Sequence, residues 1–404
     1  MQAVILAAGK STRTQPLTVT RPKSLLKVLD KTIIEHTLEA LDGIVDEVII
    51  IVGFKKEMIM DRLGSSYKSM RLFYAEQKEQ LGTGHALMSA KQHLKDRFLV
   101  INGDDIYSKE DIEALSKHDY AVLLAKVKDW ERFGIAVVED RKVKSFVEKP
   151  KEFVSDLANT GAYVFRKDIF DIELNKTERG EYEVTDYIIA LAKKGLAEYE
   201  TIQGKWIPIG YPWNYLEANV ALLREIKESR IDPTAKVEDN VIIKGTVVIG
   251  KNTIIKPGTY IEGPVFIGDD CIVGPQAYVR KDTIIMDKVN TRAEMYDVVM
   301  MDGTTSKHNS YLSHSVIGEN CNIGCGTVTA DYRHDAGENW TIINGKKINS
   351  GRRKLGAFLG DRVHTGIGTL IYPGRKIWPY CTTIPGEVVT KDITESEVKT
   401  TDKR

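Results

Sequence analysis

Two cations and a glycine turn follow a short apolar run near the start of the chain. Residues 3–8 are all apolar and end at Gly9, which is typical of a buried parallel strand that runs into a loop. Glycine lets a ligand approach the backbone, and the exposed amides of such a turn can bind phosphate. Arg13 and Lys23 then offer a guanidinium and an ammonium for phosphate oxygens. Each residue alone is more often a turn or a solvated cation, but the whole string 6–23 predicts a phosphate-binding loop.

An aspartate pair follows a second apolar run, in Gly103-Asp104-Asp105. A nucleoside triphosphate binds with Mg²⁺, which usually takes only one or two protein carboxylates. The alternative is an ordinary turn closed by an aspartate side chain. Because the pair stands at a predicted strand end, we expect Asp104 to bind the metal, with Asp105 the weaker candidate. The loop at Gly9 lacks the second and third glycines of a dinucleotide fingerprint, which disfavours a dehydrogenase.

The elements around these residues alternate between strand and helix. Apolar periodicity predicts helices over 33–41 and 58–63 and strands over 47–52, 71–75 and 99–102. This alternation is typical of a doubly wound, Rossmann-like α/β domain with a mostly parallel sheet. Ligands in such folds bind at the carboxyl ends of strands. The loops at Gly9 and Asp104 are therefore expected to face one crevice.

A different period begins at Ile231. Aliphatic residues recur at every sixth position to Ile285, and the register returns after an interruption at Ile317, Ile323 and Leu359. A period of six fits neither an amphipathic helix nor a hairpin sheet, and it is typical of a parallel β-helix of hexapeptide repeats. Small residues two positions earlier are expected to point inward as well. These include Cys271, Cys321, Cys381.

Length and composition bound the remaining possibilities. The chain has 404 residues, with 57 basic and 57 acidic side chains, so nothing in its charge calls for nucleic acid or an anionic membrane. No apolar run approaches the roughly 20 residues that span a bilayer, and four cysteines form no disulfide framework. We expect a cytoplasmic protein with domains at 1–228 and 229–395 and a polar tail at 396–404.

The first domain resembles sugar-1-phosphate nucleotidylyltransferases through the string 6–23, Gly103-Asp104 and the segments 76–84, 134, 148–150 and 159–161. The resemblance implies catalytic roles for Arg13 and Lys23 and a metal ligand at Asp104. Relatives often place a second metal-binding Asp where this chain has Pro208, so Asn214 is the substitute candidate. The substrate-binding residues that the resemblance implies are Leu6, Ala8, Gly9, Gln77, Gly82, Thr83, Gly134, Glu148, Lys149 and Asn159.

The second domain resembles the left-handed β-helix of hexapeptide acyltransferases, and the segment around His308 resembles the acetyltransferase half of GlmU-like enzymes. His308 would be the general base, with Tyr311, Asn322 and Tyr332 binding substrate. A lone histidine is otherwise an ordinary surface residue. Three positions depart from the family: Asp331 stands where Asn is usual, Tyr296-Asp297 where Lys is usual, and the segment after Asp331 lacks an expected Lys.

Both halves together resemble the archaeal-type bifunctional sugar-1-phosphate nucleotidylyltransferase/acetyltransferase. That resemblance implies Mg²⁺, acetyl-CoA as co-substrate, UTP or dTTP, a sugar-1-phosphate and a homotrimer or higher homo-oligomer. It implies synthesis of UDP-N-acetylglucosamine by acetylation of glucosamine-1-phosphate and transfer of a uridylyl group. One alternative is a UTP- or dTTP-glucose-1-phosphate nucleotidylyltransferase whose β-helix serves only assembly. Another is a regulatory subunit that binds sugar nucleotides, which Arg13, Lys23 and Asp104 weigh against because a binder needs no metal carboxylate.

Overall fold

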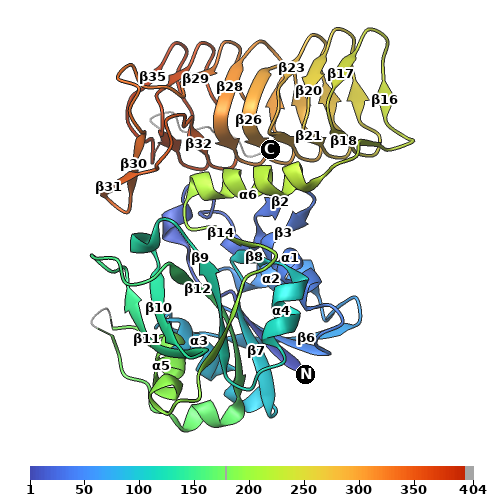
Figure 1. Ribbon diagram of the computed structural model, residues 1–404. Helices are drawn as coiled ribbons and strands as arrows, with labels where there is room; N and C mark the ends of the chain where they lie inside the picture. Colours follow the sequence, from blue (N-terminus) through green and yellow to red (C-terminus); the bar gives the residue numbers. More distant parts are fainter. Residues whose placement is uncertain (178–179, 396–404) are drawn as a thin grey trace. The chain divides into compact units, whose positions relative to one another are not determined.

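The computed structural model describes residues 1–177 and 180–395, and the chain forms two compact units (Figure 1). The first unit comprises Met1–Lys10, Pro22–Leu25 and Thr32–Pro208. The second comprises Ser11–Arg21, Leu26–Lys31 and the chain from Ile209 onward. The expected tail at 396–404 lies outside the described residues.

The division between the units differs from the expected one near residue 228. Helix α6 (Pro212–Glu225) belongs to the second unit, where it packs against strands β24 (Thr283–Ile285), β26 (Glu294–Met300) and β28 (Tyr311–Ile317). Apolar periodicity predicts that one face of α6 is buried, but it does not show which unit that face packs against. The sequence analysis therefore assigned α6 to the first domain, with the elements that precede it in the chain.

Two short segments of the N-terminal region also belong to the second unit. Arg21, largely buried, forms ion pairs with Glu319 and Asp361. Lys27 lies 2.7 Å from Asp287 and 2.9 Å from Asp302. These buried cations hold segments 11–21 and 26–31 against turns of the β-helix, a partnership that no local sequence pattern reveals.

The first unit is built on a ten-stranded sheet in the order β10-β11-β13-β9-β12-β7-β1-β4-β6-β5. Strand β1 pairs in parallel with β4 and β7, and β4 with β6, while β12 runs antiparallel to β7 and β9. The strands are β1 (Gln2–Leu6), β4 (Glu47–Val52), β5 (Ser66–Tyr67), β6 (Met70–Glu76), β7 (Arg97–Asn102), β9 (Ala121–Lys126), β10 (Gly134–Glu139), β11 (Lys142–Glu148), β12 (Leu157–Arg166) and β13 (Glu198–Thr201).

Among the described residues of the first unit, five α-helices and a two-stranded pair accompany this sheet. The helices are α1 (Ile33–Leu41), α2 (Lys56–Leu63), α3 (Thr83–Ser89), α4 (Lys109–Leu115) and α5 (Thr185–Lys193); β8 (Asp105–Tyr107) pairs with β14 (Trp206–Pro208). A capping box starts α1, with Thr32 accepting from the backbone of Glu35 while Glu35 accepts from Thr32 N–H. Buried aliphatic residues cover both faces of β1, β4 and β7, as expected for central parallel strands. The predicted α/β domain is confirmed.

The second unit is a parallel β-helix whose regular coils advance by 18 residues. Val247, for example, pairs with Val265, and Val265 pairs with Thr283. Besides those already given, its strands are β15 (Arg230–Ile231), β16 (Lys236–Val237), β17 (Ile242–Lys244), β18 (Val247–Ile249), β19 (Ile254–Ile255), β20 (Tyr260–Glu262), β21 (Val265–Ile267), β22 (Ile272–Val273), β23 (Tyr278–Val279), β25 (Asn290–Thr291), β27 (Thr305–Ser306), β29 (Val328–Thr329), β32 (Phe358–Leu359), β33 (Leu370–Ile371), β34 (Lys376–Ile377) and β35 (Val388–Val389). An antiparallel hairpin of β30 (Trp340–Ile343) and β31 (Lys346–Asn349) leaves the coils before β32.

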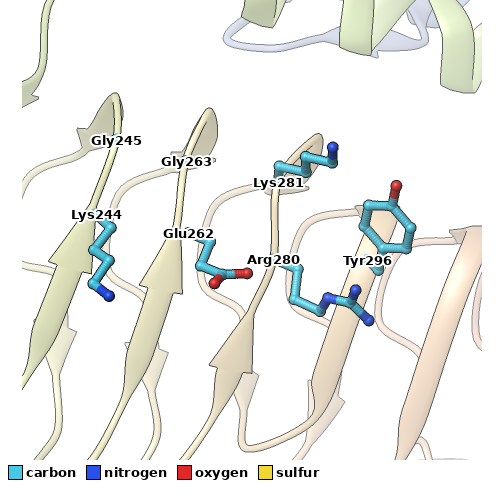
Figure 2. Close-up of a pocket in the computed structure, with 7 residues that line it drawn as sticks. All are labelled: Lys244, Gly245, Glu262, Gly263, Arg280, Lys281 and Tyr296. Carbon is cyan, nitrogen blue, oxygen red and sulfur yellow. The ribbon is translucent and has the colours of Figure 1, made fainter.

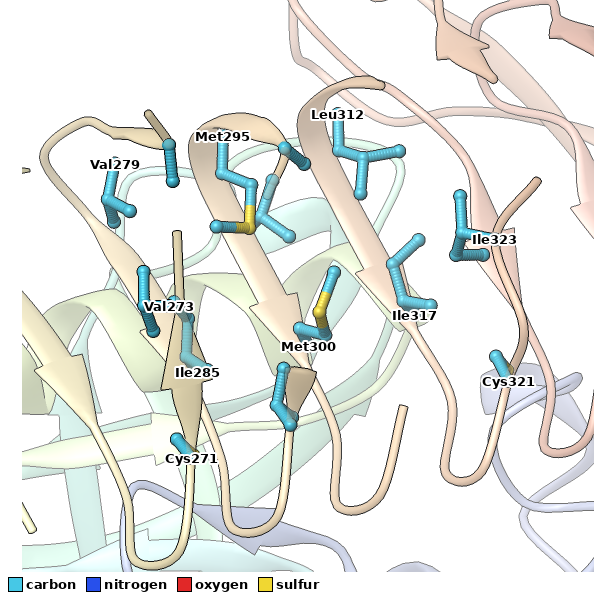
Figure 3. Packing of buried hydrophobic residues seen from close by; sticks show 14 of the residues in the cluster. Cys271, Val273, Val279, Ile285, Met295, Met300, Leu312, Ile317, Cys321 and Ile323 are labelled. Atoms are coloured by element: carbon cyan, nitrogen blue, oxygen red, sulfur yellow. The ribbon is translucent and has the colours of Figure 1, made fainter. Parts of the chain in front are cut away.

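The sixth-position aliphatic residues fill the interior of the β-helix, as predicted (Figure 3). Ile267 and Ile285 are fully buried, whereas Ile231, on the first coil, is 47% exposed because no coil precedes it. The small inward positions also match, since Cys271, Cys321 and Cys381 are buried free thiols. Burial raises the pKa of Cys271 and of Cys321 to about 12, so both behave as small apolar core residues.

Candidate functional site

The Gly9 loop and the Asp104 turn lie at neighbouring strand ends in the first unit. Leu6, at the end of β1, is in register with Asn102, at the end of β7. The N–H of Gly103 donates to the carbonyl of Leu6 at 3.0 Å. The two loops therefore begin next to each other, at hydrogen-bonded backbone. Nothing lies within 4 Å of the position that a Cβ on Gly9 would take. Gly9 thus leaves open space at the strand ends where ligands of such sheets bind.

Lys23 and Asp104 meet at this edge. The ammonium of Lys23 lies 2.6 Å from Oδ2 of Asp104. The Lys23 side chain is only 6% exposed, whereas that of Asp104 is 39% exposed. A largely buried ammonium beside an accessible carboxylate is suited to exchange its partner for a phosphate oxygen while the carboxylate binds a cation.

The donors around Asp104 fit Mg²⁺ held chiefly by substrate oxygens. Asp105 is buried and accepts from the indole of Trp206 at 3.2 Å, so Asp104 is the more accessible carboxylate of the pair, and its role as the metal ligand stays a prediction. Pro208 stands opposite Asp105 in the β8–β14 pair and offers no side-chain ligand. In the described part of the chain no group of three or more His, Cys, Asp or Glu side chains is arranged around a metal position. One carboxylate with phosphate oxygens and water is nevertheless a common Mg²⁺ environment.

The segment 77–84 forms a tight loop up to Gly82 and then the first residues of α3. Gln77 is buried, and its amide nitrogen donates to the carbonyl of Gly82 at 2.9 Å. Gly82 has φ of 95°, and a Cβ there would lie 2.4 Å from the carbonyl oxygen of Tyr182, so only glycine fits. The hydroxyl of Thr83 donates to Glu183 at 3.0 Å. Gln77 and Gly82 are thus brought together, and Thr83 links their loop to the segment before α5.

The residues expected at the sugar phosphate lie on β10, β11 and β12. Gly134 pairs with Glu148 across the β10–β11 ladder, and a Cβ on Gly134 would lie 3.0 Å from Oε2 of Glu148. Lys149 follows with its ammonium 3.6 Å from Oε1 of Glu148, and both side chains are exposed. Asn159, on β12, donates to the hydroxyl of Tyr163 at 2.7 Å. Ile135, next to Gly134, pairs with Ala158, next to Asn159.

Two predicted residues of this site, Arg13 and Asn214, belong to the second unit. Arg13 is exposed, with its guanidinium carbon 5.7 Å from the ring centroid of Tyr211. The amide oxygen of Asn214 accepts from the backbone N–H of Tyr211 at 3.0 Å, and its nitrogen donates to Glu217 at 2.9 Å. Asn214 therefore caps the start of α6, and its role as a metal ligand stays a prediction.

The residues expected at the acetyl-transfer site lie on neighbouring coils of the β-helix. His308 is exposed and precedes β28, which begins at Tyr311. Tyr311 pairs with Val328 on the next coil. Asn322 is exposed and lies 3.2 Å from the hydroxyl of Thr305, and Tyr332 is 51% exposed. Asn322 and Tyr332 thus present exposed side chains, and Tyr311 is half-buried, on two neighbouring coils.

A cleft of about 440 Å³ lies along one corner of the same β-helix (Figure 2). Its lining carries three cationic side chains, Lys244, Arg280 and Lys281, and one carboxylate, Glu262. The Arg280 guanidinium carbon lies 4.6 Å from the ring centroid of Tyr296, which closes one end. Sequence reasoning noted Tyr296 only as a departure and missed the cations, because their meeting depends on the 18-residue register. Aligning the coils by that register would have shown Glu262 and Arg280 one coil apart.

The fold and these loops define a nucleotidyl transferase joined to a hexapeptide β-helix. A family model described as nucleotidyl transferase matches residues 2–225. The chain is 41% identical over 398 residues to the bifunctional protein GlmU of Methanocaldococcus jannaschii, covering 97% of this chain and 96% of that protein. It is 39% identical over 403 residues to the bifunctional sugar-1-phosphate nucleotidylyltransferase/acetyltransferase of Sulfurisphaera tokodaii, covering 97% and 98%. The chain therefore belongs to the family of GlmU-like bifunctional nucleotidylyltransferase/acetyltransferases, as the sequence analysis expected.

A solved structure agrees with this for the first half. It is described as a glucose-1-phosphate thymidylyltransferase from Bacillus anthracis in complex with a sucrose, with a TM-score of 0.52 and 33% identity. The match covers 57% of this chain and 98% of that one. Among the described residues, no helix is both long and apolar enough to cross a membrane.

Proposed function

We propose that the protein makes UDP-N-acetylglucosamine in two steps. The second unit transfers an acetyl group from acetyl-CoA to glucosamine-1-phosphate, and the first unit couples the product to UTP with release of pyrophosphate. The observation that carries the nucleotidyl half is the Lys23–Asp104 pair at the carboxyl ends of β1 and β7. Full-length relatives named as bifunctional support the pairing of both activities in one chain.

The nucleotidyl step needs positioning and charge neutralisation more than proton transfer. A sugar phosphate is largely ionised at neutral pH, because its second pKa is near 6. One of its oxygens attacks the α-phosphorus of UTP, and the bond to the pyrophosphate oxygen breaks. Lys23 would neutralise the phosphates, and Arg13 would bind the departing pyrophosphate. Asp104 would hold Mg²⁺, which supplies further charge neutralisation on the phosphate oxygens when bound.

Loop 77–84 and the β10–β12 residues would fix the two substrates. Gln77 and the backbone at Gly82 would take the base, because an amide offers both a donor and an acceptor. Glu148 would accept from sugar hydroxyls, and Lys149 would contact the sugar phosphate. Their exposure leaves both side chains available to a ligand. The same groups would serve dTTP, so the choice of UTP rests on the relatives.

In the acetyl step, the acceptor amine attacks the thioester carbonyl, a proton leaves the nitrogen, and the bond to the CoA sulfur breaks. His308 would take that proton, and Tyr311 and Asn322 would orient the acceptor. The cleft cations Arg280 and Lys281 would attract the phosphate in place of the lysines that this chain lacks. Hexapeptide β-helices pack as trimers in the family that this chain resembles, and we propose the same here.

Two assays on the full-length chain test both halves. Asp104→Asn should remove pyrophosphate release at ordinary Mg²⁺ concentrations and leave CoA release unchanged. His308→Ala should reduce CoA release by about 10²–10⁴-fold, the usual contribution of a positioned base, and leave pyrophosphate release unchanged. Near-normal turnover in either variant would contradict the role assigned to that residue. If the unaltered chain released no CoA with any amino-sugar phosphate, the β-helix would serve assembly alone.

A further inference from the structure

Most of the chain between Gly9 and Lys23 belongs to the second unit, although both of those residues belong to the first. This segment runs from Ser11 to Arg21 and carries Arg13, whose guanidinium is assigned above to the departing pyrophosphate. It is joined through the chain to the Gly9 loop on one side and to the 3₁₀ turn of Lys23 on the other. Contacts that the segment makes within the second unit therefore bear on a group that serves the first.

The first part of segment 11–21 is a compact loop. The hydroxyls of Thr14 and Thr18 both donate to the backbone carbonyl of Ser11, at 2.8 Å and 2.9 Å. Both threonines are buried. Arg13 lies inside the loop that these hydrogen bonds close, so a restraint on either end of the segment also restrains the direction of Arg13.

Arg21 fastens the end of segment 11–21 to two turns of the β-helix. Its guanidinium pairs with Glu319 through Nη1 and with Asp361 through Nη2, and the hydroxyl of Thr20 donates to the same oxygen of Asp361. The side chains of Arg21 and Asp361 are only 12% and 9% exposed. The other oxygen of Asp361 accepts from the backbone N–H of Glu319 at 2.8 Å. A planar guanidinium between two carboxylates that are themselves held has a defined orientation.

The β30–β31 hairpin contacts the beginning of the same segment. Its tip residue Asn344 has φ of 48°, and the amide nitrogen of Asn344 donates to the hydroxyl of Thr12 at 3.0 Å. Thr12 directly precedes Arg13 on the 3₁₀ turn Thr12–Thr14. The base of the hairpin is fastened to a coil, since the hydroxyl of Thr341 donates to the carbonyl of Gly374 at 2.8 Å. The hairpin therefore links the β-helix to the residue beside Arg13.

The ring of Tyr211 contacts Arg13 itself. The distance of 5.7 Å between the guanidinium carbon and the ring centroid is that of a cation–π contact. Tyr211 stacks on Trp213, with their centroids 4.5 Å apart, and Trp213 is buried near the start of α6. Because α6 packs on the β-helix, this contact also comes from the second unit.

We propose that Arg21 and Asn344 are positioning residues of the nucleotidyl step, which hold Arg13 in the direction in which it binds the departing pyrophosphate. The inference rests on the nucleotidyl transfer proposed above and extends its supporting residues to the β-helix, through Glu319, Asp361 and the β30–β31 hairpin. A guanidinium that is held before the substrate binds loses less freedom when it contacts a phosphate. The β-helix thus contributes to the reaction of the first unit in addition to any chemistry of its own.

The first test is a double-mutant cycle at Asn344 and Thr12 in the full-length chain. Asn344→Gly suits the positive φ of the hairpin tip and removes the amide. In calorimetry with Mg²⁺ it should weaken the binding of pyrophosphate about two- to tenfold, as for loss of one neutral hydrogen bond. Thr12→Val should give a loss at least as large, and adding Asn344→Gly to it should have no further effect, because both remove one contact. Thr12→Ser keeps the hydroxyl and should retain most of the affinity.

The second test changes the buried ion pairs from the β-helix side. Asp361→Asn keeps the shape of the side chain and removes the charge that faces Arg21. It should lower kcat/KM for UTP about ten- to a hundredfold, as for loss of a hydrogen bond between charged groups. The KM for N-acetylglucosamine-1-phosphate should be unchanged, because Glu148 and Lys149, which are assigned to that substrate, do not belong to the segment.

Each test has a matched control on the same structural element. Asn349 also lies on the hairpin, but its amide donates to Glu338 at 2.7 Å, so Asn349→Ala should leave pyrophosphate binding unchanged. Asp282 is a buried β-helix carboxylate that accepts from the guanidinium of Arg224 at 2.8 Å and 2.7 Å. Asp282→Asn should lower the melting temperature as Asp361→Asn does and leave kcat/KM for UTP unchanged.

The outcomes separate this inference from the proposed function. Additive losses in the Asn344 and Thr12 variants, or an equal loss in Asn349→Ala, would overturn the inference. So would an equal loss of kcat/KM in Asp282→Asn, because the ion pairs of Arg21 would then serve folding alone. If pyrophosphate release were normal in every variant, the inference would be wrong and the proposed function would stand. If Asn344→Gly weakened pyrophosphate binding but no sugar phosphate reacted with UTP, the proposed function would be wrong and the positioning would stand.

Discussion

Replacing Gly9 by alanine tests whether a ligand approaches the first loop closely. The added Cβ would meet nothing within 4 Å, and φ at Gly9 lies outside the left-handed region. Folding should therefore be unaffected or slightly favoured, because alanine reduces the entropy of the unfolded chain by about 0.4–1 kcal/mol. If a nucleotide phosphate fills the open space, the methyl group overlaps it, and such overpacking typically costs about 1–3 kcal/mol. This range corresponds to a loss of about 5- to 150-fold in kcat/KM for UTP.

Gly82→Ala is the matched control, because there the protein itself occupies the space. Its φ of 95° is unfavourable for alanine, and the Cβ would lie 2.4 Å from the carbonyl oxygen of Tyr182. Strain of this kind costs about 1–3 kcal/mol before any displacement of backbone. Gly82→Ala should therefore lower the melting temperature and the activity together, whereas Gly9→Ala should lower the activity alone.

The assay is pyrophosphate release at UTP concentrations well below KM, with thermal unfolding of the same preparations. Wild-type kcat/KM in Gly9→Ala would refute the close approach of phosphate to this loop. A lower melting temperature in Gly9→Ala would show instead that its surroundings are more crowded than described. Either result would contradict the proposal that a ligand, and not the protein, fills the space beside Gly9.

Three further predictions concern stability. Ile267→Ala should destabilise the β-helix by about 2–5 kcal/mol in urea unfolding followed by circular dichroism, whereas Ile231→Ala, on the same column of side chains but 47% exposed, should cost much less; equal losses would contradict the packing. Burial alone would lower the pKa of His118, but its hydrogen bonds to Glu198 and Glu200 outweigh burial and raise that pKa. Its stabilising contribution is therefore complete below the unfolded pKa of about 6.5 and is lost as pH rises through the higher folded pKa. Relative to His118→Gln, the wild-type melting temperature should fall across that window, and parallel curves would exclude the effect. Residues 1–228 expressed alone should aggregate in light scattering, because Arg21 loses both carboxylate partners; a monodisperse fragment would contradict this.

Local sequence patterns were sufficient to predict the main strands and helices and the change from an α/β domain to a β-helix. The run before Gly9 became β1, and the six-residue period became the coils of the β-helix, because both patterns reflect burial along one strand. The same reasoning placed Asp104 at a strand end, where Lys23 meets it. Lys23 itself lies on a 3₁₀ turn, Lys23–Leu25, whose burial no short motif indicated.

Partnerships across long sequence distances were not predictable from those patterns. Arg21 is an ordinary cation in the sequence, yet its carboxylates lie 298 and 340 residues further along. Helix α6 has an apolar face, and its sequence alone does not show which of the two units that face packs against. His314 was not singled out, since a histidine within a repeat is most often a core or surface residue, and the two carboxylates beside it, Asp297 and Asp331, come from different coils. The contacts of His314 depend on which residues of neighbouring coils pair. That pairing can be read from the sequence only when the number of residues in each coil is known, including the residues that leave the coils in the β30–β31 hairpin.

The 18-residue register also bears on how such a chain can change length. Ile267, Ile285 and Ile377 continue one inward column, and Leu359 stands 18 positions before Ile377. Ile317 pairs with Leu359 across 42 positions, 24 more than a regular coil, and that surplus contains the β30–β31 hairpin. A duplication of eighteen codons would add a coil and keep every inward residue inward. An insertion of another length can leave the coils as a protrusion, as the β30–β31 hairpin does, or change the length of one coil, as where Ile285 pairs with Met300 across 15 positions and Met300 with Ile317 across 17.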